Sequence, residues 1–523
     1  MWRPLKSRTT GSNADSRKGC PYKVMIKKIL VANRGEIAVR IIRACKEMGI
    51  ETVAVYSEVD RRALHVQLAN EAYLIGPPAP LESYLNMDKI IDVAKKTNSD
   101  AIHPGYGFLA ENPLFDKRCE DEGIIFIGPN SKALALVGDK IESRKTMIKA
   151  KIPIIPGMKS KGENLDEFLT EAEKIGYPVM VKASAGGGGK GMRVIRSKDE
   201  LKSSVEAGKR EAKSAFGDDS VYLEKYIENP RHIEFQVVAD HQGNVVHLFE
   251  RECSIQRRHQ KIVEETPSTA LTPQLRAEMG EIATKVIKVS GYTNAGTVEF
   301  LLDKNGNYYF LEVNARIQVE HPITELTTGV DLVKTQIRIA NGEKLPFKQD
   351  ELSQRGHAIE CRIYAEDPEN DFLPSFGKIL FVKEPQGPGI RNDSGLYSGL
   401  EVTMHYDPIL AKLICWAENR DAARRKMICA LSDYVILGIK TQIEFLKDVM
   451  EHPEFAVGST FTDFIPRNLS DWTGKRQKKK FIEPALIATA LDLFNKTSGK
   501  TKIERKQTSF DPWLTIGKWE IGT

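Results

Sequence analysis

Residues 27–57 constrain the fold most strongly, because they read as a buried strand, a helix and a second buried strand. The apolar run KKILVAN comes first. The run GEIAVRIIRACKEMG then repeats apolar residues at helical spacing and stops at Gly49, and the apolar run ETVAVYS follows at once. A strand–helix–strand unit of this kind predicts a parallel sheet covered by helices.

The turn after the first of these strands reads Asn33-Arg34-Gly35-Glu36. It lacks the spaced glycines of the dinucleotide-binding fingerprint, so a nicotinamide enzyme is not indicated. Further along, DAIHPGYGFLAENPLF reads as a strand end followed by a functional loop, and the strand GIIFIG closes the unit near Gly128. We therefore expect a Rossmann-like first domain without a dinucleotide site.

The pattern changes after this first domain. Residues 177–228 alternate strand, glycine-rich loop, strand, helix and strand. From Pro230 strands dominate, with helical patterns at 273–290 and 331–341 and a helical pair ending near Trp472. This pattern predicts a large antiparallel sheet, so the expected fold class is α/β joined to α+β. A chain of 523 residues fits two to four domains.

Composition excludes several classes of function. The net charge of +5 is mild, and no stripe interleaves aromatic with basic residues. The composition therefore does not indicate a nucleic-acid-binding protein. No apolar run approaches the length of a membrane span. The seven cysteines are scattered singly without a C-x-x-C pair. This suits a reducing compartment, so we expect a cytoplasmic protein without disulfides or structural zinc.

The two ends of the chain differ from the rest. Residues 1–24 are basic and polar and lack the apolar core of a secretory signal, so a disordered or tag-like extension is favoured over an organelle transit peptide. Residues 473–523 open with the basic run GKRQKKK, which reads as a linker or a solvated face. An amphipathic helix, EPALIATALDLFNK, is expected after it.

A glycine-rich loop, AGGGGKG at 185–191, follows the strand YPVMVKAS. It is not a Walker A loop, because Met192 follows Gly191 and the next element is a strand rather than a helix. A flexible hairpin tip can lay backbone N–H groups over phosphates and lift away again. The alternative is a plain linker, but Lys182 on the strand and Lys190 in the loop favour phosphate binding.

Carboxylates cluster in the strand-forming sequence GTVEFLLDKNGNYYFLEVN. Asn305-Gly306 predicts a two-residue type I′ turn, whose register sets Asp303 opposite Tyr308 and Glu299 opposite Glu312. Facing carboxylates repel each other unless a cation lies between them. The oxygen ligands Glu299, Glu312 and Asn314 suit Mg²⁺ or Mn²⁺. The alternative is a solvated face, against which the flanking apolar residues argue.

Two further polar clusters point to an anion. Arg316, Gln318 and Glu320 alternate with apolar residues, which predicts that they share one face of a continuing strand. An arginine beside a carboxylate can hold a small anion against a base, although an ordinary Arg–Glu pair is the alternative. The segment ECSIQRRHQKIVEE carries enough donors to bind a polyanion, whereas His232 and His259 taken singly are more often structural.

Together these segments resemble the biotin carboxylase family of the ATP-grasp fold. The resemblance is carried, in family order from about residue 27 to residue 470, by ILVANRGEIAVRIIRACKEMGI, HPGYGFLAEN, FIGP, GDK, KASAGGGGKGMR, EKYIENPRHIEFQV, ECSIQRRHQKIVEE, GTVEF, EVNARIQVEHPITE and HAIECRIYAEDP. It implies a Rossmann-like (pre-ATP-grasp) domain at 25–128, linker helices at 129–154, a mobile lid at 155–228, and an ATP-grasp core with a C-terminal biotin carboxylase domain at 229–472.

The resemblance implies that ATP phosphorylates bicarbonate to carboxyphosphate, whose CO₂ carboxylates carrier-bound biotin. Glu320 would be the base, and Arg316, Arg362 and Lys261 would complete the catalytic set. The implied ATP site comprises Lys140, Lys182, Gly187, Gly188, Gly189, Lys190, Gly191, Met192, Glu224, Lys225, Ile227, His232, Gln256, His259 and Glu299. Metal is assigned to Glu299, Glu312 and Asn314, bicarbonate to Lys261, Arg316, Gln318 and Val319, and biotin to Tyr106, Gly107 and Arg362.

The resemblance also implies partners. No biotin-accepting MKM tripeptide occurs, so we expect a stand-alone subunit, commonly a homodimer, with a separate biotin carboxyl carrier protein and carboxyltransferase. The acyl acceptor stays open among acetyl-CoA (hence fatty acid biosynthesis), other acyl-CoAs and pyruvate. Residues 475–523 either dock on a partner or are a remnant.

The chain departs from the family pattern at Tyr364, where many relatives have Asn, and at Ala315, which varies between Thr and Pro elsewhere. Neither change removes a chemical group assigned above. Two alternatives remain open from the sequence. One is an ATP-grasp ligase that joins a carboxylate to an amine, and the other is a nucleotide-binding subunit without turnover.

Overall fold

The predicted parallel sheet is present at the start of the computed structural model. Its five strands lie in the order β3-β2-β1-β4-β5, and every neighbouring pair is parallel. Leu30 and Val31 of β1 are fully buried in two different apolar clusters, so the sheet needs helices on both faces. The elements are β1 (Lys28–Val31), α1 (Gly35–Glu47), β2 (Glu51–Ser57), α2 (Leu64–Leu68), β3 (Glu71–Gly76), α3 (Met87–Lys96), β4 (Ala101–His103), α4 (Pro113–Asp121) and β5 (Ile125–Phe126).

The structure describes residues 25–158, 162, 164–184, 192–258 and 260–498. They fall into two units, of which the first ends at Trp472 and the second begins at Thr473. Among the described residues, no helix combines the length and the apolar character that crossing a membrane requires.

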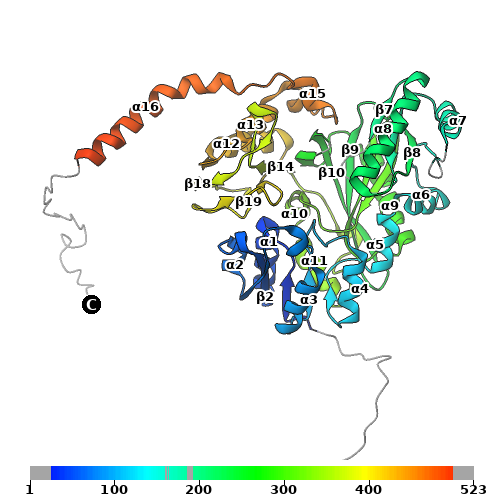
Figure 1. Cartoon of the computed structure of the whole chain (residues 1–523), viewed down its shortest axis with the longest axis horizontal. Helices are drawn as coiled ribbons and strands as arrows, with labels where there is room; N and C mark the ends of the chain where they lie inside the picture. The colour runs from blue at the N-terminus through cyan, green and yellow to red at the C-terminus, as the bar shows by residue number, and fades with distance from the viewer. Residues whose placement is uncertain (1–24, 159–161, 163, 185–191, 259, 499–523) are drawn as a thin grey trace, which may run out of the picture. The chain divides into compact units, whose positions relative to one another are not determined.

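A small lid-like layer follows the first sheet (Figure 1). Three antiparallel strands lie in the order β7-β6-β8, and α7 and α8 pack on them around the buried ring of Phe168. The elements are α5 (Ser131–Gly138), α6 (Lys140–Lys149), α7 (Leu165–Ile175), β6 (Val179–Ala183), β7 (Arg193–Ile195), α8 (Lys198–Phe216) and β8 (Val221–Lys225).

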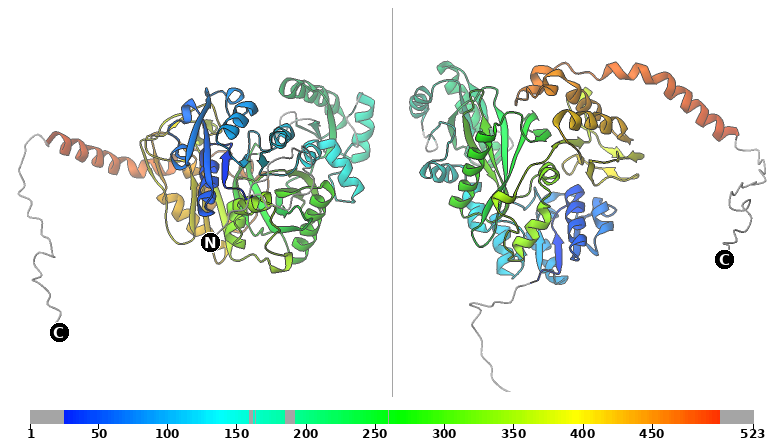
Figure 2. Two further views of the ribbon diagram at one scale, coloured as in Figure 1. Left: turned by 90° about the horizontal axis from the view of Figure 1, so that it is seen from below. Right: turned by 180° about the vertical axis from the view of Figure 1, so that it is seen from behind.

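The predicted antiparallel sheet has eight strands in the order β13-β12-β9-β10-β11-β14-β21-β19. Its long strands, drawn in green, are seen from below and from behind in Figure 2. The elements are β9 (Arg231–Ala239), β10 (Val245–Arg257), β11 (Gln260–Thr266), α9 (Pro273–Ser290), β12 (Asn294–Leu302), β13 (Tyr308–Asn314), α10 (His321–Thr328), α11 (Leu332–Ala340), β14 (His357–Tyr364), β19 (Ile390–Ser394) and β21 (Ile409–Ala417).

On strand β14 of this sheet, apolar side chains point to one face and charged side chains point to the other. Ile359, Cys361 and Ile363 of β14 point into an apolar cluster that includes α12 and α13. Glu360 and Arg362 alternate with them and therefore point to the opposite face, on the side of α10. The remaining elements are β15 (Glu366–Asp367), β16 (Leu373–Pro374), β17 (Gly377–Lys378), β18 (Phe381–Lys383), β20 (Glu401–Val402), α12 (Arg420–Asp433), β22 (Val435–Leu437), α13 (Ile443–Glu451), α14 (Pro453–Ala456) and α15 (Phe464–Asn468).

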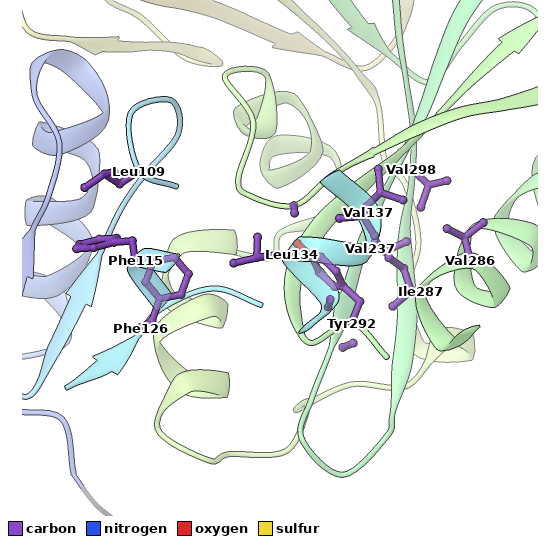
Figure 3. Close-up of a cluster of buried hydrophobic side chains, with 14 of the residues drawn as sticks. Leu109, Phe115, Phe126, Leu134, Val137, Val237, Val286, Ile287, Tyr292 and Val298 are labelled. Atoms are coloured by element: carbon purple, nitrogen blue, oxygen red, sulfur yellow. The ribbon is translucent and has the colours of Figure 1, made fainter. Parts of the chain in front are cut away.

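One apolar cluster joins the parallel sheet to the antiparallel sheet (Figure 3). Phe115 of α4 meets Phe126 of β5 edge-to-face, with 6.0 Å between ring centres. Leu134 of α5 continues the cluster toward Tyr292, and Val298 of β12 belongs to the same set. This shared core fixes the end of the parallel sheet against the strands that carry the candidate site.

The hairpin of β12 and β13 corrects two predictions. Leu302, not Asp303, lies opposite Tyr308, because the Asp303 carboxylate accepts hydrogen bonds from the backbone N–H groups of Asn305 and Asn307 and widens the turn. The predicted two-residue type I′ turn is therefore wrong. A register shift between Glu299 and Phe300 then restores the predicted pairing of Glu299 with Glu312.

One further prediction about the elements is wrong. The strand ends at Asn314, so Arg316, Gln318 and Glu320 lie in an irregular segment before α10 rather than along one strand face. In the second unit, α16 (Lys475–Ser498) includes the predicted helix EPALIATALDLFNK and begins inside the basic run GKRQKKK. Most of that run is therefore helical, and its alternative as a solvated face stays a prediction.

Candidate active site

The ammonium group of Lys261 on β11 lies at the centre of the candidate site. Its Nζ lies 2.8 Å from Glu299 Oε1 and 2.8 Å from Glu320 Oε1. The buried carboxylate of Glu234 is a third partner. Burial alone would lower the pKa of Lys261, but the three carboxylates raise that pKa well above its usual value. Lys261 is therefore a permanent cation within a ring of acids.

Glu299 is approached by four polar side chains from different parts of the fold. Oε1 accepts from Asn314 Nδ2 at 2.8 Å and from Gln318 Nε2 at 3.1 Å, in addition to Lys261. His232 Nε2 lies 3.1 Å from Oε2. Burial would raise the pKa of Glu299, but Lys261 and His232 hold it well below its usual value. Glu299 is therefore an ionised carboxylate at neutral pH.

His232 and Gln256, two residues of the predicted nucleotide site, contact each other. Gln256 Nε2 lies 2.9 Å from His232 Nδ1, and both side chains are buried. The two residues lie on β9 and β10, which are neighbours in the sheet. His232 is thus held between Gln256 and Glu299, which fixes the orientation of its ring.

Glu320 lies between two cations. Its Oε1 faces Lys261, and its Oε2 accepts from Arg362 Nη2 at 3.0 Å. Arg362 is held on its other side by Glu264, with 2.6 Å between Nε and Oε1. Burial would raise the pKa of Glu320, but Lys261 and Arg362 keep it well below the usual value. The base predicted from the sequence is therefore ionised, and two charged hydrogen bonds fix its orientation.

The donor set fits a divalent cation. Glu299 and Glu312 face each other across β12 and β13, and Asn314 is opposite Thr297, further along the same two strands. Lys140, at the start of α6 after its N-cap Asp139, lies 3.9 Å from Glu312 Oε2. Two carboxylates and an amide oxygen on neighbouring strands are the hard oxygen ligands that Mg²⁺ and Mn²⁺ prefer.

Arg316 lies at the same site but has different partners from those considered from the sequence. Its Nε lies 3.1 Å from Glu111 Oε2, and its Nη2 donates to Asn314 Oδ1 at 3.1 Å. Within the part of the chain that the structure describes, Arg316 does not form an ion pair with Glu320, which instead contacts Lys261 and Arg362. The side chain of Arg316 is 21% exposed, so it can reach a ligand from solvent.

The three-stranded layer of β6, β7 and β8, predicted to be a lid, carries a second group of the predicted nucleotide residues. Lys182 Nζ on β6 lies 2.7 Å from Glu224 Oε2 on β8, and Arg144 of α6 approaches the same carboxylate at 3.0 Å. Lys225 Nζ instead donates to the carbonyls of Gly176 and Tyr177. Met192 and Ile227 are half-buried. Gly187, Gly188, Gly189, Lys190, Gly191 and His259 lie outside the described residues.

The loop after β4 holds the predicted biotin residues Tyr106 and Gly107. Asn33 Nδ2 donates to the carbonyl oxygens of Pro104 and Tyr106, at 2.7 Å in each case. Gly105 has φ +64°, and a Cβ there would lie 2.9 Å from Asn33 Nδ2, so the close approach requires glycine. The Tyr106 hydroxyl donates to Glu36 Oε1 in the first turn of α1.

Sequence reasoning missed several residues that build the site. Arg251 is fully buried and donates to Glu234, Gln236, Thr297, Thr324 and Gln318. Glu234 could have been found, because it follows His232 by two residues on a strand and so shares its face. Arg251 gave no such signal, since its partners lie up to 73 residues away in the sequence.

Family descriptions match the chain in three consecutive parts. Residues 25–134 match the N-terminal domain of biotin carboxylase, and residues 360–467 match its C-terminal domain. Residues 139–348 match the ATP-binding domain of the carbamoyl-phosphate synthase L chain. They contain Lys261 with its partners Glu234, Glu299 and Glu320, which we call the Lys261 cluster.

Individual relatives cover nearly all of the first unit. The biotin carboxylase of Nostoc sp. is 54% identical over 438 residues, which are 84% of this chain and 98% of that protein. The biotin carboxylase domain of Hydrogenobacter thermophilus 2-oxoglutarate carboxylase, solved as a dimer with MgADP, ADP and bicarbonate, is 51% identical with a TM-score of 0.82, covering 85% of this chain and 98% of that one.

A third similar protein is the Campylobacter jejuni biotin carboxylase, solved in a β,γ-ATP complex. It is 45% identical with a TM-score of 0.83, and the match covers 85% of this chain and 99% of that one. The match of all three domain descriptions in order, with relatives above 50% identity across most of the chain, agrees with the geometry of the Lys261 cluster. The chain therefore belongs to the biotin carboxylase family, whose members are ATP-dependent ligases.

Proposed function

We propose that the Lys261 cluster performs the two steps of biotin carboxylation. ATP first phosphorylates bicarbonate, and the resulting carboxyphosphate splits into CO₂ and phosphate. The phosphate takes the N1′ proton of carrier-bound biotin, and N1′ attacks the CO₂. The products are carboxybiotin, ADP and phosphate. The observation that carries this proposal is the placement of Glu320, an ionised buried carboxylate with Lys261 at 2.8 Å and Arg362 at 3.0 Å.

Glu320 takes the proton of bicarbonate in this proposal. Bicarbonate is a poor nucleophile until that proton is removed, and a general base within hydrogen-bond reach supplies the step. Gln318, whose amide is fixed by Arg251 and Glu299, and the backbone of Val319 bind the anion beside Glu320. Arg316 neutralises its charge. Arg362, one hydrogen bond from Glu320, stabilises the negative charge that develops on the biotin ureido oxygen.

The nucleotide is proposed to lie between the lid and the sheet. Lys140, Lys182 and Lys261 neutralise its phosphates, and His232 and Gln256 complete the polar wall. Glu299, Glu312 and Asn314 would hold Mg²⁺ or Mn²⁺, which neutralises charge on the phosphates when it is bound. The homologous structure with MgADP and bicarbonate supports this assignment of substrates.

We also propose the setting in which the chain works. One relative is called the small subunit of a 2-oxoglutarate carboxylase, which supports separate carrier and carboxyltransferase chains as partners. The solved domain dimer supports a homodimer. Free cysteines at Cys45, Cys119, Cys253, Cys361, Cys415 and Cys429 support the reducing cytoplasm. The carboxyltransferase, and not this site, selects the acyl or keto acid acceptor.

The test is ADP formation by the purified chain. With MgATP and free biotin, we expect ADP to appear only when bicarbonate is present and biotin to increase its rate, with carboxybiotin as a product. ADP formation that needs an amine and another carboxylate would instead support a different ligase. Nucleotide binding without bicarbonate-dependent ADP would overturn the proposal.

A further inference from the structure

Lys412 is a buried lysine that the proposed reaction does not use. It lies on β21, and its side chain is 0% exposed. Nζ lies 3.0 Å from the carbonyl oxygen of Val319, 3.2 Å from Glu36 Oε2 and 3.8 Å from Asp393 Oδ2. Removing an ammonium from water is costly unless such acceptors replace the water. These three acceptors therefore fix the position of the Lys412 ammonium group.

The partners of Lys412 belong to separate parts of the site. Val319 is the residue before Glu320, so the carbonyl that Lys412 holds is that of the peptide bond entering the proposed base. Glu36 accepts the hydroxyl hydrogen bond of Tyr106, and the Lys412 ammonium lies 5.9 Å from the centre of the Tyr106 ring. One buried cation thus links the loop that carries Tyr106 and Gly107, called here the biotin loop, to the Val319–Glu320 segment.

The strand register adds a second observation. Lys412 lies directly opposite Arg362 across β14 and β21, and directly opposite Asp393 across β21 and β19. Facing like charges repel each other. Each cation is therefore held by its own acids, Arg362 by Glu264 and Glu320, and Lys412 by Glu36 and Asp393.

We propose that Lys412 is a positioning residue for carboxyl transfer, which sets the biotin loop relative to the Val319–Glu320 segment by binding Glu36 and the Val319 carbonyl at one ammonium. This inference rests on the proposed function. It predicts that loss of the ammonium leaves bicarbonate-dependent ATP cleavage more intact than biotin carboxylation, because a reacting group displaced by about 1 Å can cost about 100-fold in rate.

The electrostatics of Glu36 agree with this role. Burial raises the pKa of Glu36 to about 7, against the opposing effect of Lys412. Without Lys412, Glu36 therefore takes up a proton more readily, and the acceptor of the Tyr106 hydroxyl changes. The charges of Asp393 and Arg391 also act on the Glu36 carboxyl group, and these two residues form an ion pair with each other. Among the described residues, Lys412 supplies the one ammonium that donates to the Val319 carbonyl.

The test compares Lys412→Met and Lys412→Arg with the wild type, using ADP and carboxybiotin formation measured separately. For Lys412→Met we expect the KM for free biotin to rise about 10-fold and the carboxybiotin formed per ADP to fall, since a lost charge-assisted hydrogen bond changes an equilibrium by about 10- to 100-fold. Lys412→Arg keeps the positive charge, so it should restore part of the carboxybiotin formed per ADP. Arg276→Met is the matched control, because it removes an ion pair with buried Glu250, at 2.8 Å, that contacts neither loop.

A structural role for Lys412 gives a different result. Lys412→Met would then lower both products in proportion, with unchanged KM, as Arg276→Met is expected to do, and the proposal would be overturned. Should Lys412→Met fail to fold, Lys412→Arg and Glu36→Gln carry the same test, and an unchanged KM and product ratio in both would overturn it. A wild type without bicarbonate-dependent ADP overturns the proposed function itself and this inference with it.

Discussion

Glu320 and Lys261 form an ion pair with 2.8 Å between Oε1 and Nζ, at the junction of α10 with the antiparallel sheet. The pair has a consequence for the chemistry. A carboxylate held by Lys261 and Arg362 is ionised over the whole neutral range, and it is also a weak base. It can deprotonate bicarbonate only if the anion binds beside cations that favour the more highly charged form, a role that Arg316 and Lys261 can fill.

The first prediction concerns Glu320→Gln. The amide keeps the size of the side chain and an acceptor for Lys261, but it cannot take a proton. We expect bicarbonate-dependent ADP formation to fall by roughly 10²- to 10⁴-fold, the usual contribution of a general base. The apparent Tm should fall only modestly, since Lys261 keeps Glu299 and Glu234. Exposed Glu418→Gln is the control, and an active Glu320→Gln would remove Glu320 from the mechanism.

The second prediction concerns the metal. Glu312→Gln removes one carboxylate from the proposed Mg²⁺ site while leaving the strand pairing intact. We expect the Mg²⁺ concentration for half-maximal ADP formation to rise about 10-fold, which corresponds to about 1.4 kcal/mol. Mn²⁺ binding, followed by its electron paramagnetic resonance signal in the presence of ADP, should weaken by a similar factor. Unchanged Mn²⁺ binding would mean that Glu312 is not a ligand.

Much of the fold is readable from the sequence where local signals agree. The run ETVAVYS forms β2 with the predicted bounds, and α9 spans Pro273–Ser290 as predicted. In α9 the signals are strong, because Thr272 caps the first turn, Pro273 begins the helix and Gly291 ends it in the left-handed conformation.

The failures come from side chains that compete with backbone patterns. At Asn305-Gly306 the carboxylate of Asp303 supplies an acceptor that a type I′ turn does not use. After Asn314 the alternating pattern of Arg316, Gln318 and Glu320 mimics a strand, whereas each side chain is drawn to a different partner. Lys412 could not be predicted at all, since its role depends on which strands become neighbours.

The third prediction concerns stability in acid. Burial would raise the pKa of Glu265, but His357, at 2.8 Å, and Arg420, at 2.6 Å, lower it to about 2. A depressed carboxylate pKa contributes stability above the unfolded value of about 4.3, and this contribution is lost as the pH falls toward 2. The shift corresponds to on the order of 3 kcal/mol.

Glu265→Gln should therefore have a much lower apparent Tm than the wild type at pH 7. The difference should shrink as the pH is lowered from 5 to 3, because the wild type loses the contribution that the variant lacks. Differential scanning calorimetry at a fixed scan rate measures this difference in apparent Tm, with the exposed Glu418→Gln as the control. A difference that stays constant with pH would show that packing, and not charge, makes Glu265 important.

The last prediction concerns Glu360, which faces Glu264 across β11 and β14. Neither carboxyl oxygen of Glu360 has a hydrogen-bond partner among the described residues, and the side chain is fully buried. Burial and the neighbouring Glu264 raise the pKa of Glu360 well above its usual value. The folded state therefore favours the protonated carboxyl group of Glu360, and the stability linked to that proton is lost as the pH rises toward the raised pKa.

Glu360→Gln should not lose stability as the pH rises, because an amide does not titrate. We expect its apparent Tm to match the wild type at pH 5 and to exceed it by about 1–3 °C at pH 8. Glu264→Gln is the informative control, since Glu264 accepts from Arg362 at 2.6 Å and its loss should destabilise the protein. If the offset between Glu360→Gln and the wild type is the same at pH 5 and pH 8, Glu360 does not hold the proton, and the two facing acids must share their charge through Arg362.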